Sequence, residues 1–106
     1  MFSGLDYVFL AISRFTVANT LDTAVRDAFL SRPHLVDAVP GFIRMEVATP
    51  SDTRKEFWLF TWWQDEASFD SWHRSHLYHA AHTGIPKGLK LEPNQTKLIR
   101  LEVFAQ

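Results

Sequence analysis

The chain has 106 residues, of which 46% are hydrophobic and 14% aromatic, and its formal net charge is −1. This length predicts a single domain over residues 1–106 with one hydrophobic core. The balanced charge, with Lys and Arg scattered along the chain, argues against a nucleic-acid partner. The absence of cysteine excludes disulfides, thiolate metal sites and cysteine nucleophiles.

The first strongly apolar segment is not typical of a targeting sequence. MFSGLDYVFLAI, residues 1–12, has no basic leading region and carries Asp6 inside its apolar run. No uninterrupted apolar run reaches about 18 residues, the length that a membrane-spanning helix needs. We therefore expect a soluble, cytoplasmic protein that does not use a membrane as a partner.

The first third of the chain predicts a strand followed by a helix. Residues 7–17, YVFLAISRFTV, are rich in β-branched and aromatic residues and are apolar at both parities, which predicts a strand covered on both faces. Asn19 and Thr20 offer a helix cap, and apolar residues then recur at helical spacing as far as Ser31. Pro33 ends this helix and is expected to begin a short second helical turn.

Two further strands are predicted in the middle of the chain. Residues 42–48, FIRMEVA, alternate between apolar and polar side chains, which predicts a strand with Ile43, Met45 and Val47 on one buried face. Residues 56–63, EFWLFTWW, are apolar at both parities. They predict a second strand covered on both faces.

The last third predicts a broken helix, a loop and a strand. If residues 66–82 formed one straight helix advancing about 100° per residue, no apolar stripe would result, so we expect a break near Ser75. Residues 83–95, TGIPKGLKLEPNQ, contain two Gly and two Pro and predict a loop. Residues 96–104, TKLIRLEVF, predict the final strand.

The order of these elements predicts the fold class. Strand, helix, strand, strand, helix, strand is the order of a ferredoxin-like split βαβ protomer, an α+β fold in which two helices cover one face of a four-stranded antiparallel sheet. The other sheet face stays bare, although two strands are apolar on both sides. We therefore expect a homodimer in which a second copy packs sheet to sheet, giving a dimeric α/β barrel.

Residues 72–82, WHRSHLYHAAH, hold four of the five histidines. The four lie three residues apart, and His73, His76 and His79 precede the terminal His82. These imidazoles can be solvated residues on amphipathic turns, or a pair of them can ligate zinc with Glu66 or Asp70 completing the set. A third interpretation is that a single imidazole ligates haem iron and leaves the opposite coordination position open.

Two sequence blocks resemble a known family. PGF at residues 40–42 precedes the second strand, and TWWQDEASFDSWHRSHLYHAAH at residues 61–82 combines an aromatic strand end, a Phe, a Trp and a terminal AAH. This combination resembles the antibiotic biosynthesis monooxygenase (ABM) superfamily of dimeric α/β barrels, and within it the haem-degrading monooxygenases of the IsdG type. The likeness runs over the whole chain and is specific in residues 61–82.

The resemblance implies roles for particular residues. His82, the histidine of AAH, would be the axial ligand of haem iron, and Trp72 would press on the porphyrin and distort it. The family's third active residue is an asparagine on the first strand, and at that position this chain has Ser13, followed by Arg14. A serine hydroxyl is shorter than an amide and has one donor in place of two, so this departure bears on turnover more than on haem binding.

The resemblance also implies the chemistry. Haem would be both substrate and cofactor of an oxidoreductase that opens the porphyrin ring with O2, consumes electrons from an external donor such as a reductase, and releases iron. The apolar part of the pocket would be lined by Phe9, Phe29, Val36 and Phe69. Basic side chains available for the propionates are Arg14, Lys87 and Lys90.

Two other functions stay open at this point. One is a cofactor-independent monooxygenase of the same superfamily that acts on an aromatic polyketide or quinol, in which Trp72 would position a small aromatic ligand. The other is a non-enzymatic haem-binding dimer. Trp72 can also serve simply as core, as large aromatic side chains often do.

Overall fold

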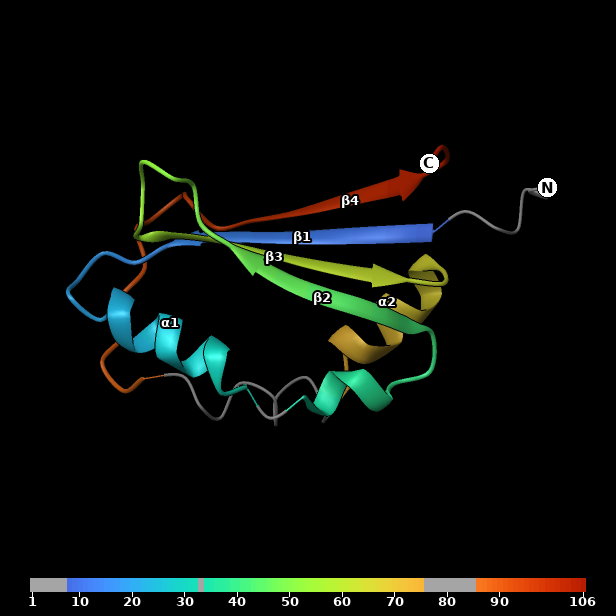
Figure 1. Ribbon diagram of the computed structural model, residues 1–106, viewed down its shortest axis with the longest axis horizontal. Helices are drawn as coiled ribbons and strands as arrows, with labels where there is room; N and C mark the ends of the chain where they lie inside the picture. Colours follow the sequence, from blue (N-terminus) through green and yellow to red (C-terminus); the bar gives the residue numbers. More distant parts are fainter. Residues whose placement is uncertain (1–7, 33, 76–85) are drawn as a thin grey trace.

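The computed structural model describes residues 8–32, 34–75 and 86–106. They form a four-stranded antiparallel sheet with strand order β2-β3-β1-β4 and helical elements between the strands (Figure 1). In chain order the elements are β1 (Val8–Thr16), α1 (Asp22–Leu30), the short 3₁₀ helix η2 (Leu35–Ala38), β2 (Phe42–Ala48), β3 (Glu56–Trp63), α2 (Glu66–His73) and β4 (Lys97–Val103). The predicted ferredoxin-like α+β fold is confirmed.

The helical elements all lie on one side of the sheet. Figure 1 shows α1, η2 and α2 in one layer beneath the strands. The register places Ala11 opposite Thr61 and Phe15 opposite Phe57, and these inner-face side chains are turned to the helices. The alternate positions form the outer face of the sheet, where Ile12 lies opposite Phe60. The two strands that are apolar at both parities, β1 and β3, occupy the centre of the sheet.

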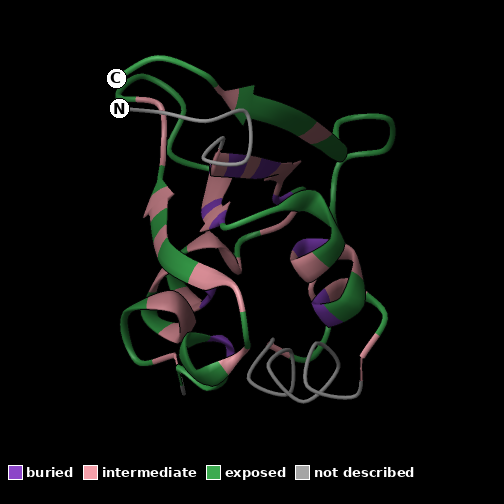
Figure 2. Cartoon of the chain, turned by 90° about the vertical axis from the view of Figure 1, so that its right-hand side faces the viewer, coloured by how far each residue is buried: buried purple, intermediate pink, exposed green. Residues whose placement is uncertain are grey.

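The buried residues between sheet and helices form two clusters. Figure 2 shows buried positions on both the strands and the helices. The α2-side cluster consists of Phe9, Ala11, Val36, Trp63, Phe69 and Trp72. The α1-side cluster consists of Val17, Val25 and Phe57. Because each helix packs on its own end of the sheet, the space between the two clusters is not filled by either of them.

The start of α1 differs from the prediction. The residue that caps α1 is Leu21, which makes no side-chain capping bond. The Asn19 side chain instead accepts a hydrogen bond from the Leu21 backbone N–H at 3.2 Å, one step before the helix. The predicted cap at Asn19 and Thr20 was therefore wrong, because the Asn19 side chain is used in the turn that precedes the helix.

The second helical turn also begins later than predicted. The turn that was expected from Pro33 begins at Leu35 as η2, after His34 in the left-handed conformation with φ of 59°. Pro33 itself lies outside the described residues.

The strand β2 does not bury all three alternating apolar residues. Ile43 is 45% exposed, whereas Met45 and Val47 lie partly buried against the two clusters. The pairing of β2 with β3 is irregular between Phe42 and Arg44. This irregularity breaks the alternation, so the prediction that Ile43 shares the buried face was wrong.

The helix α2 ends where the sequence predicted a break. Asp65 caps its start by accepting a hydrogen bond from the Ser68 N–H at 2.8 Å. The helix stops at His73, and the Ser75 hydroxyl donates to the Trp72 carbonyl at 2.6 Å. Residues 76–85 lie outside the described residues, among them His76, His79 and His82.

Residues 90–92 are hydrogen-bonded to the end of β1 and the residues that follow it. The Glu92 N–H donates to the Thr16 carbonyl at 2.8 Å, and the Ala18 N–H donates to the Lys90 carbonyl at 2.7 Å. This anchors residues 86–92 beside the end of β1. Within the described part of the chain, no helix is long and apolar enough to cross a membrane.

The outer face carries a row of stacked aromatic rings on β3. We call Trp58, Phe60 and Trp62 the aromatic ladder; their ring centroids are 6.1 Å and 6.0 Å apart. A guanidinium lies over each end, that of Arg14 at 4.5 Å from the Trp58 ring and that of Arg44 at 3.8 Å from the Trp62 ring. No described helix covers this face.

Candidate functional site

A cavity of about 340 Å³ lies between the α1-side and α2-side clusters and has residues of both on its walls. We call it the central cavity. Its lining consists of Ala11, Ser13, Arg14, Phe15, Val25, Ala28, Phe29, Arg32, His34, Leu35, Val36, Met45, Leu59, Thr61, Phe69, Trp72, His73, Pro86, Leu89, Leu91 and Thr96. This volume is in the range of small-molecule sites, and no carboxylate is among these lining residues.

Trp72 is both core and cavity wall. It is 9% exposed, and its ring centroid lies 5.5 Å from that of Trp63 and 6.3 Å from that of Phe69. Trp63 behind it is completely buried. An indole that is backed in this way is held rigidly, so the predicted role in core packing and the predicted role at a ligand are compatible at this position.

Ser13 lies on the inner face of β1, between Leu59 of β3 and Leu98 of β4. It lines the central cavity together with Thr61. The Thr61 hydroxyl is directed to the Ala11 carbonyl at 3.4 Å, so of these two hydroxyls that of Ser13 is better placed to meet a ligand.

The other predicted pocket residues fall into different environments. Phe29, Val36 and Phe69 line the central cavity, as proposed from the sequence. Phe9 is not part of this lining; it packs behind Phe69 with their rings 5.6 Å apart.

Of the basic residues predicted for the propionates, Arg14 lines the central cavity and Lys87 and Lys90 do not. The Arg14 guanidinium is engaged by Glu56 at 3.7 Å and by the Trp58 ring on the outer face. His82 lies outside the described residues.

The carboxylates proposed as zinc ligands are already engaged. Arg100 donates to Glu66 at 2.9 Å and to Asp70 at 2.8 Å, and these hydrogen bonds raise the pKa of the Arg100 guanidinium. His73 stacks on Phe69 with ring centroids 5.3 Å apart and lines the central cavity. Among the residues that the structure describes, no group of three or more candidate ligands is placed to hold a metal ion.

A charged cluster at the cavity wall was missed by sequence reasoning. Arg32 and His34 each lie 3.1 Å from a different oxygen of Asp37. Partial burial tends to raise the pKa of Asp37, but the hydrogen bonds with His34 and Arg32 outweigh it and hold that pKa below its usual value. No periodic pattern reveals this cluster, because it depends on the left-handed turn at His34.

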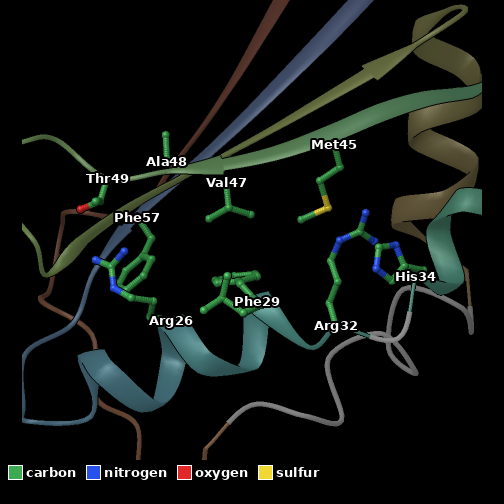
Figure 3. Close-up of a pocket in the computed structure, with 10 residues that line it drawn as sticks. Arg26, Phe29, Arg32, His34, Met45, Val47, Ala48, Thr49 and Phe57 are labelled. Carbon is green, nitrogen blue, oxygen red and sulfur yellow. The ribbon is translucent and has the colours of Figure 1, made fainter.

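A second cavity of about 370 Å³ opens between α1 and β2 (Figure 3). We call it the α1–β2 cleft. In Figure 3 the side chains of Arg26, Phe29 and Arg32 rise from α1 and the loop after it, and Met45 and Val47 descend from β2 to meet them. The cleft shares Phe29, Arg32, His34 and Met45 with the central cavity, so the two cavities adjoin.

These features describe a ferredoxin-like α+β protein with an apolar internal cavity between its sheet and its helices. The profile of the antibiotic biosynthesis monooxygenase family matches residues 8–84, and the chain belongs to this family. Proteins of this family are monooxygenases, which are oxidoreductases. The resemblance predicted from the sequence is thus confirmed at the level of the family. A search of curated protein sequences found no match.

Solved structures with the same fold have different activities. A haem degrader from Mycobacterium tuberculosis, MhuD, solved with two haems in its active site, is 21% identical, with a TM-score of 0.74 over 92% of this chain and 97% of that one. SnoaB, a cofactor-independent oxygenase from Streptomyces nogalater, is 16% identical, with a TM-score of 0.66 over 94% of each chain. Such identities establish the shared fold alone.

Proposed function

We propose that this protein is a haem-degrading monooxygenase that binds haem in the central cavity. The observation that carries this proposal is the position of Trp72 and Ser13, which line the same apolar cavity although they lie on α2 and β1. These are two of the three residues to which the family resemblance assigns an active role. The third, His82, would hold the haem iron.

The chemistry of the lining suits haem. A flat apolar macrocycle matches walls built from Phe29, Val36 and Phe69. The two propionates would meet no carboxylate among the lining residues, although Arg32, which lines the cavity, is already paired with Asp37 just outside it. When bound, haem supplies an iron that activates O2 and a ring that is itself oxidised.

The residues of the chain would then have distinct tasks. The Trp72 indole packs against Trp63 and Phe69 and would therefore form a rigid wall in contact with a flat ligand. Ser13 presents a hydroxyl donor from β1. Because this donor is shorter than the family's asparagine, we expect Ser13 to limit the rate of turnover more than the affinity for haem.

The outer face supports the expected homodimer. The aromatic ladder and its neighbours Leu101, which is 43% exposed, and Ile99 form an apolar surface that no described element covers. A second copy packing on this surface by a two-fold axis would bury it. Such pairing would complete a dimeric α/β barrel and leave the helix layer with its central cavity on the outside.

The test is a spectrophotometric titration of the purified protein with haemin, followed by ascorbate in air with catalase present. We expect saturable binding with a Soret band that is lost in His82→Ala and retained in the matched control His79→Ala. The Soret band should then decay with release of iron. Trp72→Phe should bind haemin and degrade it more slowly, because a smaller ring presses less on the macrocycle.

Ser13→Asn provides a gain-of-function test. This variant restores the family's asparagine, so we expect faster Soret decay at unchanged haemin affinity. Binding without decay, in both the wild type and Ser13→Asn, would support the non-enzymatic haem-binding dimer. Absence of binding by the wild type would contradict the proposal and direct the search to aromatic polyketides or quinols.

A further inference from the structure

The α1–β2 cleft has one cation without a counter-charge. Arg26 is half-buried, and within residues 8–32, 34–75 and 86–106 no carboxylate lies in ion-pair range of its guanidinium. Asp22 stands one helical turn before Arg26, the spacing at which helix residues commonly pair. The Arg26 guanidinium lies over the Phe57 ring instead, 5.7 Å from its centroid. Figure 3 shows it turned into the cleft.

The opposite end of the cleft is electrostatically satisfied. Arg32 is paired with Asp37 at 3.1 Å, and His34 with the other oxygen of the same carboxylate. On the Arg26 side of the cleft in Figure 3, the Thr49 hydroxyl is also occupied, since it donates to the Glu56 carbonyl at 2.7 Å. Arg26 is therefore the group of the described lining that is best able to receive an anion, and the cleft is suited to a single negative charge.

The floor between the two ends is apolar. Phe29 from α1 faces Val47 and Met45 from β2 across the cleft (Figure 3). Leu30 stands at its mouth and is 80% exposed, although the apolar side chains beside it are at least partly buried. A large apolar side chain left in water at the rim of a cavity gains free energy when an apolar body covers it.

We propose that the α1–β2 cleft binds a small organic monocarboxylate with an apolar body. The carboxylate pairs with Arg26, and a hydrocarbon or aromatic body lies along Phe29 and Val47 under Leu30. A guanidinium and a carboxylate match in geometry as well as in charge, which makes Arg the preferred residue for such recognition. This site adjoins the haem pocket proposed above and shares Phe29 with it, but Arg26 does not line the central cavity, so the proposal stands whether or not haem binds.

The proposal is tested with phenylbutyrate and its uncharged analogue phenylbutyramide, by isothermal titration calorimetry at low ionic strength. We expect saturable binding of phenylbutyrate to the wild type and a loss of affinity of about ten-fold in Arg26→Gln. Arg26→Lys keeps the charge and should fall between them. The matched control is Arg54→Gln, in the exposed turn before β3, which should bind like the wild type.

One further measurement locates the ligand, and another separates this proposal from the haem proposal. In amide NMR spectra of the wild type, phenylbutyrate should shift Leu30, Val47 and Thr49; shifts confined to Thr61 and Trp72 would put the ligand in the central cavity and overturn the proposal. Equal affinity for phenylbutyramide, no effect of Arg26→Gln, or no binding by the wild type would each overturn it too. Haemin titration of Arg26→Gln should match that of the wild type, so a failure of the haem proposal is recognised separately.

Discussion

Gly41 shows how one residue sets the position of the proposed site. It lies just before β2 in the left-handed conformation with φ of 87°, and its carbonyl accepts the Gln64 N–H at 2.8 Å. A Cβ on Gly41 would overlap the Oγ and Cβ of Ser68 in α2. Glycine is thus required twice, for its backbone conformation and for the close approach of α2 to the sheet. That approach carries Trp72 into the cavity wall.

Gly41→Ala should lower the free energy of unfolding by about 2 kcal/mol or more, because a left-handed φ costs roughly 1 kcal/mol and steric overlap adds to it. Urea unfolding measures the loss. The matched control is Gly88→Ala, since Gly88 has φ of 82° but no atom within 4 Å of the position that an added methyl group would take. Equal losses in the two variants would contradict the role assigned to the contact with Ser68.

At the scale of the element, α2 depends on its cap. The hydrogen bonds that Ser68 gives to the Asp65 carboxylate hold the pKa of Asp65 below 3.8. A depressed pKa in the folded state means that the ionised form stabilises the fold. This contribution is fully present above the unfolded pKa and is lost as the pH falls through the folded value.

Asp65→Ala should therefore lower the free energy of unfolding by about 1 kcal/mol at neutral pH. Asp65→Asn keeps an acceptor at the cap but cannot titrate. The difference in stability between wild type and Asp65→Asn should stay constant near neutrality and decline below pH 3.8, which urea unfolding across this range measures. A difference that does not change with pH would show that the carboxylate charge does not stabilise α2.

The elements themselves were largely predictable, and the site less so. Strong periodic patterns predicted every strand to within about a residue or two, because burial on one or both faces sets the composition of a strand. The exposure of Ile43 was not predictable, since it follows from an irregular strand pairing that the apolar–polar alternation of the sequence does not reveal.

Of the candidate site residues, Trp72 and Ser13 were predicted from the family resemblance. Arg26 and Arg32 were missed, because their environment depends on how α1 packs on β2.

At the scale of the whole molecule, one layer of helices covers one face of the sheet, and no element of the described residues covers the second face, which we call the open face. On the open face, Arg14 and Arg44 cover the two ends of the aromatic ladder. Its middle ring, Phe60, is the part of the described ladder with no guanidinium over it. In the proposed dimer this central ring would lie closest to the partner's sheet.

Phe60→Glu should convert the dimer to a monomer, because a carboxylate at the centre of an apolar interface would be buried without a partner. Light scattering measures the mass, and circular dichroism checks that the fold is kept. Thr23→Glu, on the exposed side of α1, adds the same charge away from the sheet and should stay dimeric. A monomeric wild type at micromolar concentration, or a dimeric Phe60→Glu, would contradict the proposed pairing.

The division of the four tryptophans between the two sides of the sheet has an optical consequence. Trp63 and Trp72 lie in the α2-side cluster with centroids 5.5 Å apart, close enough for their excited states to couple and produce an exciton couplet in the circular dichroism spectrum. Trp58 and Trp62 belong to the outer face, partly open to solvent, so their emission should shift to shorter wavelength when that face is covered. The chain thus carries two intrinsic reporters: the couplet follows events in the central cavity, and the emission of the ladder follows association.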